Sequence, residues 1–347
     1  RQEMVKILKG LLPFQNIGTH LSETEAKMIL RKLRGEEYRA QKNEQKLKFS
    51  IITPSFNEEK DIRKTIEAFL DFNYDNKEII IVDDSTDRTP EIVKEFESRG
   101  VKLIRGKGEG CCEAVNLGIQ SSTGDIIINA DADVRPPKDF LEKLNEKYNE
   151  GADWVLVDSR IPDYNHNSLF SRYSGALHIA EHPPERSDMY YAEAFSCRRK
   201  VAIELGMFGP SYPARFCRDW VLGKKLTEAG YKKVYDPKIV VLHPQPDNLK
   251  EFWNTRKARG RFGPLKLYFM DNKSLLGLFI KLIIKDLVFI IRFITIIPAA
   301  LYVFNITKHS SRKIKDFLPF YFAHIVQEAA RVFGEWEGFL INIKSSK

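Results

Sequence analysis

Asp131 and Asp133 are the residues of this chain whose spacing points most directly to chemistry. They flank Ala132 and follow the run Ile126–Ala130, whose apolar composition is typical of a buried strand in a parallel sheet. In open α/β sheets, ligands bind beyond the carboxyl ends of the strands. Two carboxylates at that edge are unfavourable without a cation, and Mg²⁺ or Mn²⁺ is typically held by one or two carboxylates with substrate phosphates. The turn therefore predicts a divalent metal site that handles a nucleotide diphosphate.

Three further polar motifs lie where a strand or a helix ends near the same edge. They are Thr53–Glu58, Asp83–Asp87 and Arg218-Asp219-Trp220. Each motif alone also has a structural interpretation, because acidic turns occur by chance and Asp, Ser and Thr are favoured as helix caps. Their order along the chain, with the Asp131 turn third, is more informative than any one of them.

The elements that must position these residues alternate between strands and helices. Strands are predicted at Phe49–Thr53, Glu78–Val82, Val101–Ile104 and Asp125–Ala130, and helices at Asp61–Phe72, Pro90–Arg99 and Gly110–Ser122. A repeat of about 25 residues for each strand and helix specifies a parallel, doubly wound α/β sheet. Further along, strands are expected at Trp154–Val157, at Tyr190–Phe195 and near Val234 and Val240, with a helix over Arg218–Ala229.

Composition narrows the class of protein. The chain has 347 residues, 43% of them hydrophobic and 29% charged, which suffices for a large core and argues against disorder. The net charge of +8 is compatible with nucleic acid, anionic lipid or a phosphorylated substrate as partner. The 4 cysteines contain no C-x-x-C pair, which predicts a reducing compartment without disulfides or structural zinc.

The chain is expected to have three parts. Residues 1–46 form a polar helical segment, 47–247 a catalytic α/β domain, and 248–347 a basic segment followed by apolar helices. The basic segment is defined by its cations, which are Lys250, Arg256, Lys257, Arg259, Arg261 and Lys266. Because no nucleic-acid recognition motif accompanies them, we expect no nucleic acid partner.

The apolar stretch Leu275–Phe304 predicts association with a membrane surface. Its longest uncharged run has about 15 residues, fewer than the roughly 20 that span a bilayer. On a helix, Lys281, Lys285 and Arg292 fall within about 40° of one another, a basic stripe that suits a helix lying among lipid headgroups. A second amphipathic segment, Phe317–Ile341, carries interfacial aromatics. Packing of both segments on the catalytic domain, and spanning of the membrane, stay open as alternatives.

The four motifs, in this order and spacing, resemble those of the family 2 glycosyltransferases of the GT-A fold, over roughly Phe49–Leu242. The resemblance implies a nucleotide-sugar donor. It implies that Asp83 hydrogen-bonds the nucleotide base, that Asp131 lies near the ribose and the metal, and that Asp133 ligates the metal directly. The further donor-binding residues expected are Pro54, Ser55, Asn57, Glu58, Gly108 and Ala132, with a simple turn at Gly108 as the alternative.

The resemblance also assigns a catalytic base and a third metal ligand. Asp219 is similar to the base of the family's Glu-Asp pair, although Arg218 stands where the family has Glu. His243, at the end of a strand, is either a metal ligand or a histidine that hydrogen-bonds at the strand end.

One element of the basic segment is similar to the Q-x-x-R-W motif of the membrane-associated synthases. It is Arg256–Gly260, in which Arg256 replaces Gln and Gly260 replaces Trp. Arg256, Arg259 and Arg261 are therefore expected to bind the donor, with Arg259 or Arg261 holding its diphosphate.

These residues predict a metal-dependent inverting glycosyltransferase. It would move a mannose- or glucose-type sugar from a GDP- or UDP-sugar, with Mn²⁺ or Mg²⁺, to a hydroxyl of a lipid-linked acceptor at the cytoplasmic face of the cell membrane. The metal and the arginines would stabilise the leaving diphosphate, and a carboxylate would accept the proton of the attacking hydroxyl. The alternatives are a polyprenyl (dolichyl) phosphate glycosyltransferase, a sugar-phosphate nucleotidyltransferase and an inactive membrane-bound binding module.

Overall fold

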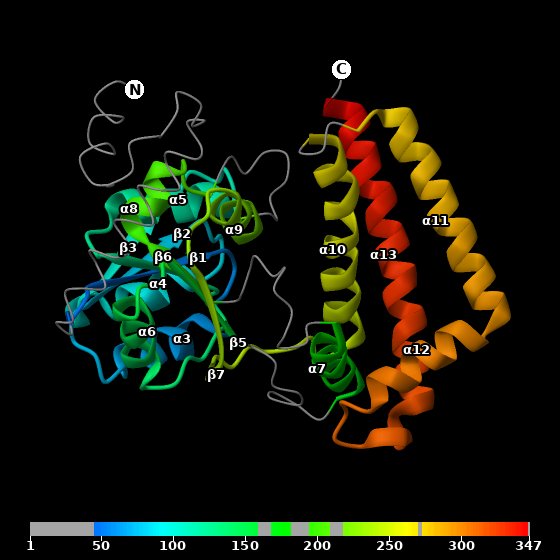
Figure 1. Ribbon diagram of the computed structural model, residues 1–347, viewed down its shortest axis with the longest axis horizontal. Coiled ribbons are helices and arrows are strands. Elements are labelled where there is room, and N and C mark those ends of the chain that lie inside the picture. The colour runs from blue at the N-terminus through cyan, green and yellow to red at the C-terminus, as the bar shows by residue number, and fades with distance from the viewer. Residues whose placement is uncertain (1–44, 159–167, 182–193, 209–217, 270–272, 346–347) are drawn as a thin grey trace, which may run out of the picture.

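The computed structural model describes residues 45–158, 168–181, 194–208, 218–269 and 273–345. Within these residues the chain forms a sheet domain and a helical unit, on the left and right of Figure 1. The helical segment predicted at residues 1–46 lies outside the described residues, apart from its last two positions.

The sheet domain is built on seven described strands in the order β3-β2-β1-β4-β6-β5-β7. All neighbouring strands are parallel except β6, which runs antiparallel to β4 and β5. The strands are β1 (Phe49–Ser55), β2 (Lys77–Asp83), β3 (Val101–Arg105), β4 (Ile126–Ala130), β5 (Trp154–Asp158), β6 (Ala194–Arg198) and β7 (Lys233–Val240). The predicted doubly wound, mainly parallel sheet flanked by helices is therefore confirmed.

Helices cover the two faces of this sheet. They are α3 (Ile62–Leu70), α4 (Thr89–Lys94), the short 3-10 helix η1 (Glu97–Arg99), α5 (Cys111–Ser121), α6 (Phe140–Asn149), α8 (Arg199–Glu204) and α9 (Arg218–Glu228). Helices α5, α8 and α9 lie on one side of the sheet, and α3 and α6 lie on the other (Figure 1). Because both faces are covered, β1 and β4 are buried along their whole length, as expected of continuous apolar runs in parallel strands.

The register of the central strands brings the predicted motifs to one edge. Ser55, the last residue of β1, pairs with Asp83, the last residue of β2. β4 lies on the other side of β1 and is parallel to it. The polar residues that follow these three strands therefore meet at the carboxyl edge of the sheet, where ligands of such folds bind.

The helical unit consists of two separate parts of the chain. Its elements are α7 (Leu169–Glu181), α10 (Leu249–Phe269), α11 (Leu275–Thr295), α12 (Ile297–Thr307), the 3-10 helix η2 (Lys313–Asp316) and α13 (Phe317–Ser345). Tyr173 of α7 packs edge-on against Phe252 of α10 and Phe320 of α13. The buried guanidinium of Arg172 donates two hydrogen bonds to Asp316, at 3.0 and 2.9 Å. Helix α7 thus packs with the C-terminal helices, although it precedes the domain boundary predicted at residue 247.

Some elements differ from those predicted, for local reasons. The apolar stretch Leu275–Phe304 is two helices, because Ile296 has a φ of 55° and Pro298, which has no N–H, lies in the first turn of α12. The two short strands expected near Val234 and Val240 are one strand, β7. Helix α10 is not predicted, since its apolar residues form no one-sided stripe. Among the described helices, none is both long enough and apolar enough to cross a membrane.

Candidate metal and nucleotide site

Asp131, Asp133 and His243 converge at the carboxyl edge of the sheet. One ligand atom from each lies within 4.8 Å of the others. His243 Nε2 is 3.6 Å from Asp133 Oδ1, and all three residues are half-buried. The grouping favours the metal-ligand interpretation of His243 over a histidine bonded only at a strand end.

A short antiparallel bridge places His243 beside the aspartates. The backbone N–H of Arg135 donates to the carbonyl of Leu242 at 2.7 Å, and the N–H of Leu242 donates back at 3.1 Å. Arg135 lies two positions after Asp133, and Leu242 directly precedes His243. The backbone pairing therefore sets the position of the imidazole relative to the turn.

Thr65 and Arg135 hold the turn itself in place. The hydroxyl of Thr65 donates to the carbonyl of Ala132 at 2.6 Å and accepts from Arg135 at 2.6 Å. Arg135 also donates to a carboxylate oxygen of Asp61 at 2.8 Å. Ala132 is 5% exposed and its carbonyl accepts this hydrogen bond, and its assignment to the donor stays a prediction. The sequence analysis missed both Thr65 and Arg135.

The pKa of Glu58 is affected by the negative charge at this edge of the sheet. Burial, and to a smaller extent the nearby carboxylates of Asp133, Asp61 and Asp131, raise the pKa of its carboxyl to about 7. Carboxylates this close together disfavour one another's ionisation, and nearby positive charge compensates that repulsion. A divalent ion at the Asp131–Asp133–His243 group would supply that compensation.

The loop after β1 is tied to the loop after β2. The N–H of Asn57 donates to Ser85 Oγ at 2.8 Å, and its side-chain oxygen accepts from the N–H of Thr86 at 2.9 Å. The N–H of Glu58 donates to Thr89 Oγ1 at 2.9 Å. Asn57 has a φ of 60°, which Asn tolerates better than most residues. These bonds hold the loop over the sheet edge, next to the candidate metal ligands.

Asp83 is fully buried beneath this loop, and its carboxylate is already well bound. It accepts hydrogen bonds from Ser55 Oγ at 2.8 Å and Ser85 Oγ at 2.6 Å, and it pairs with Arg105. Pro54 is buried in β1, one residue before Ser55. The half-exposed guanidinium of Arg105 was missed by the sequence analysis, although its position at the end of β3 could have indicated it.

Gly108 belongs to a second loop at the same edge. It has a φ of 71°, which favours glycine, and its N–H donates to Asp84 Oδ1 at 2.8 Å. Asp84 and the residues after β3 line a small cavity of about 120 Å³, to which Asn116 of α5 also contributes. The loop of Gly108, where the backbone is predicted to approach the donor closely, thus lies beside a small polar cavity.

The remaining predicted residues lie elsewhere. Asp219 is in the first turn of α9, but its side chain lies outside the described part of the structure. Arg256 is 6% exposed inside the helical unit, where it donates to Ser174 at 2.8 Å and lies over the ring of Phe252. Burial, with a smaller effect of nearby Arg259, lowers the pKa of Arg256 to about 9.

Arg259 and Arg261 differ in their surroundings. Arg259 is exposed, and Arg261 pairs with Glu337 of α13 at 2.7 Å. The contacts described for Arg256 and Arg261 lie within the helical unit. The assignment of these arginines to the donor stays a prediction.

The residues at the sheet edge fit a divalent metal. Two carboxylates and an imidazole supply oxygen and nitrogen donors close enough to share one ion. Carboxylates suit Mn²⁺ and Mg²⁺, whereas an imidazole nitrogen is a poor ligand for Mg²⁺, which takes mainly oxygen. Burial is the main cause of the raised pKa of Glu58, and the carboxylates of Asp133 and Asp131 add to it, so positive charge at this edge would be favourable.

Comparison with known proteins agrees with this geometry. Residues 50–207 match glycosyl transferase family 2. A probable glycosyltransferase, YdaM of Bacillus subtilis, is 29% identical over 234 residues, which are 61% of this chain and 55% of the relative. A dolichol-phosphate mannosyltransferase of Pyrococcus furiosus is 36% identical over 121 residues, 33% of either chain. The chain thus aligns with about half of the first of these relatives and a third of the second.

Among solved structures, a mannosyltransferase from Pyrobaculum calidifontis in complex with GDP-Man and Mn²⁺ is similar to this chain. The alignment covers 93% of this chain and 83% of the other, with 17% sequence identity and a TM-score of 0.49. Residues 50–207 contain three of the four motifs, and those three meet at one edge of the sheet. The match to glycosyl transferase family 2 therefore covers the part of the chain that carries the two candidate metal aspartates and the loops after β1 and β2.

Proposed function

We propose that this protein is a metal-dependent inverting glycosyltransferase. It moves a mannose- or glucose-type sugar from a GDP- or UDP-sugar to a hydroxyl of a lipid-linked acceptor. The observation that carries the proposal is the Asp131–Asp133–His243 group at the carboxyl edge of the sheet, in a chain that matches this family over residues 50–207. A sugar-phosphate nucleotidyltransferase, considered from the sequence, does not agree with the family match.

Asp131, Asp133 and His243 would hold the metal, and the nitrogen ligand favours Mn²⁺ over Mg²⁺. Bound there, a divalent ion neutralises charge on the leaving diphosphate. The loops after β1 and β3, with Asn57, Glu58 and Gly108, would enclose the nucleotide. Asp83, which is predicted to hydrogen-bond the nucleotide base, would also hold Ser55, Ser85 and Arg105 in position.

Asp219 would accept the proton of the acceptor hydroxyl as that oxygen attacks the anomeric carbon. A carboxylate suits this step, because it removes the proton in the transition state without forming a covalent bond. A single displacement inverts the configuration at that carbon. The position of Asp219 at the start of α9, on a helix that packs on the sheet, supports this role.

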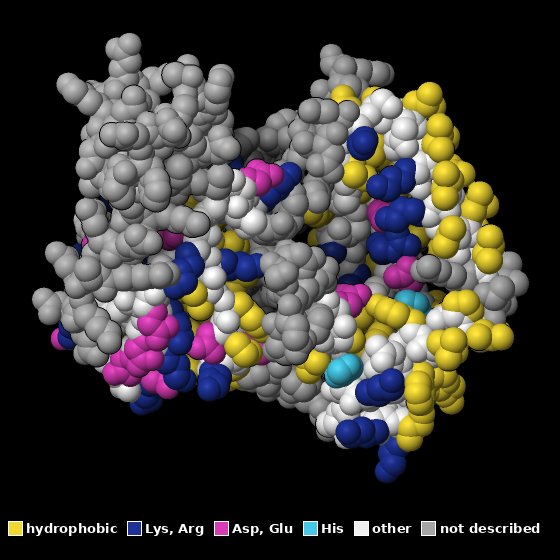
Figure 2. All heavy atoms as spheres, in the orientation of Figure 1, with side chains coloured by type: hydrophobic (Ala, Val, Ile, Leu, Met, Phe, Trp, Pro, Cys, Tyr) yellow, Lys and Arg dark blue, Asp and Glu magenta, His cyan; other side chains and the backbone are white. Residues whose placement is uncertain are grey.

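A membrane-bound acceptor is supported by the surface of the helical unit. Large apolar side chains of α11 and α12 are exposed, among them Leu276 at 69%, Leu287 at 54% and Leu301 at 65%. Figure 2 shows hydrophobic side chains along the outer edge of the helical unit. Soluble proteins rarely expose so continuous an apolar surface. We propose that this face lies on the cytoplasmic surface of the cell membrane.

Donor binding tests the metal site. In a thermal-shift panel of GDP- and UDP-sugars, the wild-type chain should be stabilised by one nucleotide class only when Mn²⁺ is present, since ligands that bind the native state raise its stability. Asp133→Asn should abolish the stabilisation, and Glu142→Gln, an exposed carboxylate of α6, should leave it intact. Equal stabilisation of the Asp133→Asn variant would contradict the assignment.

A polyprenyl phosphate glycosyltransferase is the second candidate. The 36% identity to a dolichol-phosphate mannosyltransferase favours it. An acceptor phosphate is already ionised and needs no general base, so the two candidates differ in their need for Asp219.

The Asp219→Asn variant separates these candidates. If the acceptor is a hydroxyl, the variant should transfer sugar roughly 10²- to 10⁴-fold more slowly, the usual contribution of a general base. Its donor-dependent thermal shift should be unchanged, and Glu228→Gln, at the other end of α9, should transfer normally. Retained transfer by Asp219→Asn to a lipid phosphate would favour the second candidate instead.

A further inference from the structure

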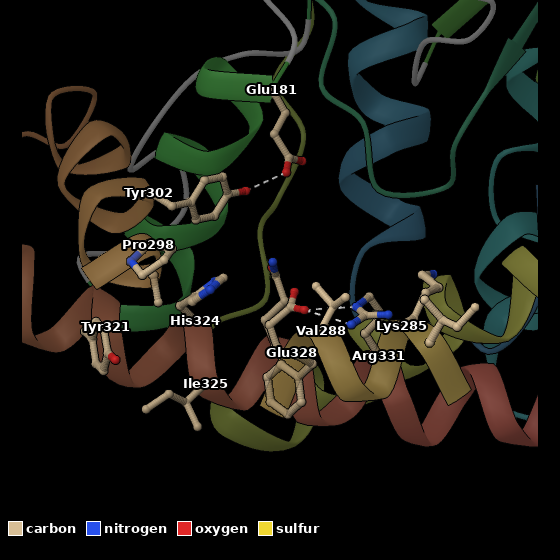
Figure 3. A pocket seen from close by; sticks show the side chains of 14 residues that line it. Glu181, Lys285, Val288, Pro298, Tyr302, Tyr321, His324, Ile325, Glu328 and Arg331 are labelled. Carbon is tan, nitrogen blue, oxygen red and sulfur yellow. Dashed lines mark hydrogen bonds and ion pairs between the residues drawn. The ribbon is translucent and has the colours of Figure 1, made fainter. Parts of the chain in front are cut away.

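A cavity in the helical unit contains none of the predicted site residues. Its volume is about 700 Å³, within the roughly 300–1,000 Å³ typical of small-molecule pockets. Helices α7, α11, α12 and α13 contribute its walls. Figure 3 shows its side chains, which include both apolar and polar groups.

The apolar part is continuous with the exposed apolar face of α11 and α12. Ile284 and Val288 line the cavity and are 54% and 41% exposed, so the same residues belong to both surfaces. Pro298 and Ala299 of α12 complete this wall. A hydrocarbon chain could therefore enter the cavity from a membrane on this face, without crossing water.

The polar part includes the side chains of Tyr302, Glu181 and Gln327. Tyr302 donates to Glu181 at 2.8 Å (Figure 3). Burial and the neighbouring Glu181 raise the pKa of Tyr302 above its usual range, so it stays a neutral hydroxyl. The side-chain oxygen of Gln327 is buried and accepts no hydrogen bond from the described residues. A ligand hydroxyl would find acceptors in the carboxylates of Glu181 and Glu328, which also line the cavity.

The cations of the cavity are already neutralised. Lys285 pairs with Glu335, and Arg331 pairs with Glu328 at 2.9 Å and Glu335 at 2.7 Å. Glu181 adds a further negative charge. A phosphate placed here would lose hydration without gaining an unpaired cation among the described residues, which is unfavourable. The charge balance favours a neutral headgroup.

We infer that this cavity binds a neutral, hydroxyl-bearing lipid, with its hydrocarbon chain along α11 and α12 and its hydroxyls toward Gln327 and Glu328. The inference rests on the proposed function only for the source of the lipid. A lipid of this chemistry is either the sugar acceptor or a component of the surrounding bilayer, and the experiment below distinguishes the two.

The test compares two soluble probes with the same alkyl chain, dodecyl β-glucoside and dodecyl phosphate. Their equilibrium binding to the full chain, held in an amphipathic polymer, is measured below the critical micelle concentration. We expect one saturable site for the glucoside and at least tenfold weaker binding of the phosphate. Tighter binding of the phosphate would overturn the inference.

Matched variants test whether the glucoside binds in this cavity. Ala299→Phe should fill the cavity and weaken glucoside binding at least tenfold, whereas Ala300→Phe, the same change beside it and outside the lining, should not. If Ala299→Phe lowers the thermal stability of the chain, Gln327→Leu serves instead, and it should reduce the preference for the glucoside over the phosphate. Equal glucoside binding by Ala299→Phe and Ala300→Phe in folded protein would overturn the inference.

Measurements of sugar transfer then show whether the lipid is the sugar acceptor or a component of the bilayer. With the sugar donor and Mn²⁺, loss of transfer to dodecyl β-glucoside in Ala299→Phe identifies the lipid as the acceptor, and unchanged transfer identifies a bilayer lipid. Donor-dependent thermal shifts are recorded in parallel. Because donor binding does not involve the cavity, failure of the proposed function and failure of this inference give different results.

Discussion

The charge of Glu58 is coupled to the candidate metal site. Its pKa of about 7 arises from burial and from the carboxylates of Asp133, Asp61 and Asp131. About half of the Glu58 carboxyls therefore carry a proton at pH 7. A cation near Asp131 and Asp133 would favour the ionised form and expel that proton.

Mn²⁺ binding at pH 7 should therefore release about half a proton from Glu58. Titration calorimetry in buffers of different ionisation enthalpy measures this release. The release should fall as the pH rises above 7, because Glu58 is then already ionised. Glu58→Gln should lose this component, and Glu59→Gln, an exposed neighbour, should keep it. The same proton release in wild type and Glu58→Gln would show that the two sites are not coupled.

Helices α10 and α13 pack at unusually close range, and glycine makes this possible. A Cβ atom on Gly334 would overlap the backbone carbonyl of Lys257, and one on Gly338 would overlap that of Arg261. The two glycines lie one turn apart on α13, so they present a flat strip to α10. The strip also brings Glu337 to Arg261, which explains why this arginine is paired within the helical unit.

Gly334→Ala should separate these helices. Overpacking of this kind typically lowers the free energy of unfolding by about 1–3 kcal/mol, which thermal or denaturant unfolding measures. Gly263→Ala is the matched control on α10, because no atom lies within 4 Å of its added Cβ, and its effect should stay below about 1 kcal/mol. A Gly334→Ala variant as stable as the control would contradict this packing.

Most of the large apolar side chains that are exposed among the described residues belong to the helical unit. Exposed Ile280 and Leu287 lie on α11, and one charge of the predicted basic stripe of that helix is already paired. Lys281 and Lys285 are both exposed, and Lys285 pairs with Glu335 of α13. The side chain of Arg292 lies outside the described part of the structure. Apolar contact, more than the basic stripe, would therefore attach this face to a membrane.

The double variant Ile280→Glu, Leu287→Glu should lose binding to phospholipid vesicles in a sedimentation assay. Burial of one such side chain contributes about 1.5–3 kcal/mol, so the loss should exceed tenfold. The same substitution at Ile203, which is 44% exposed on α8 of the sheet domain, should not change vesicle binding. Unchanged vesicle binding by the double variant would contradict the proposed orientation.

Local pattern predicted much of this molecule. The strands at Phe49, Glu78, Val101 and Asp125 could be read from short apolar runs, because burial between two layers of helices requires such runs. The four motifs and the aspartates of the metal site followed from the positions of those runs. Each of these predictions depends on residues close together in the chain.

The tertiary structure alone decided which distant residues meet. His243 approaches Asp133 because Leu242 pairs with Arg135, and α7 joins α13 because Arg172 and Tyr173 pack there. The cavity likewise needs walls from four helices. Such contacts follow from how whole elements pack, which depends on the combined shape and burial of many residues. The sequence by itself therefore determined the sheet and the carboxylates of the candidate site, and the tertiary structure decided the third candidate ligand, the helical unit and its cavity.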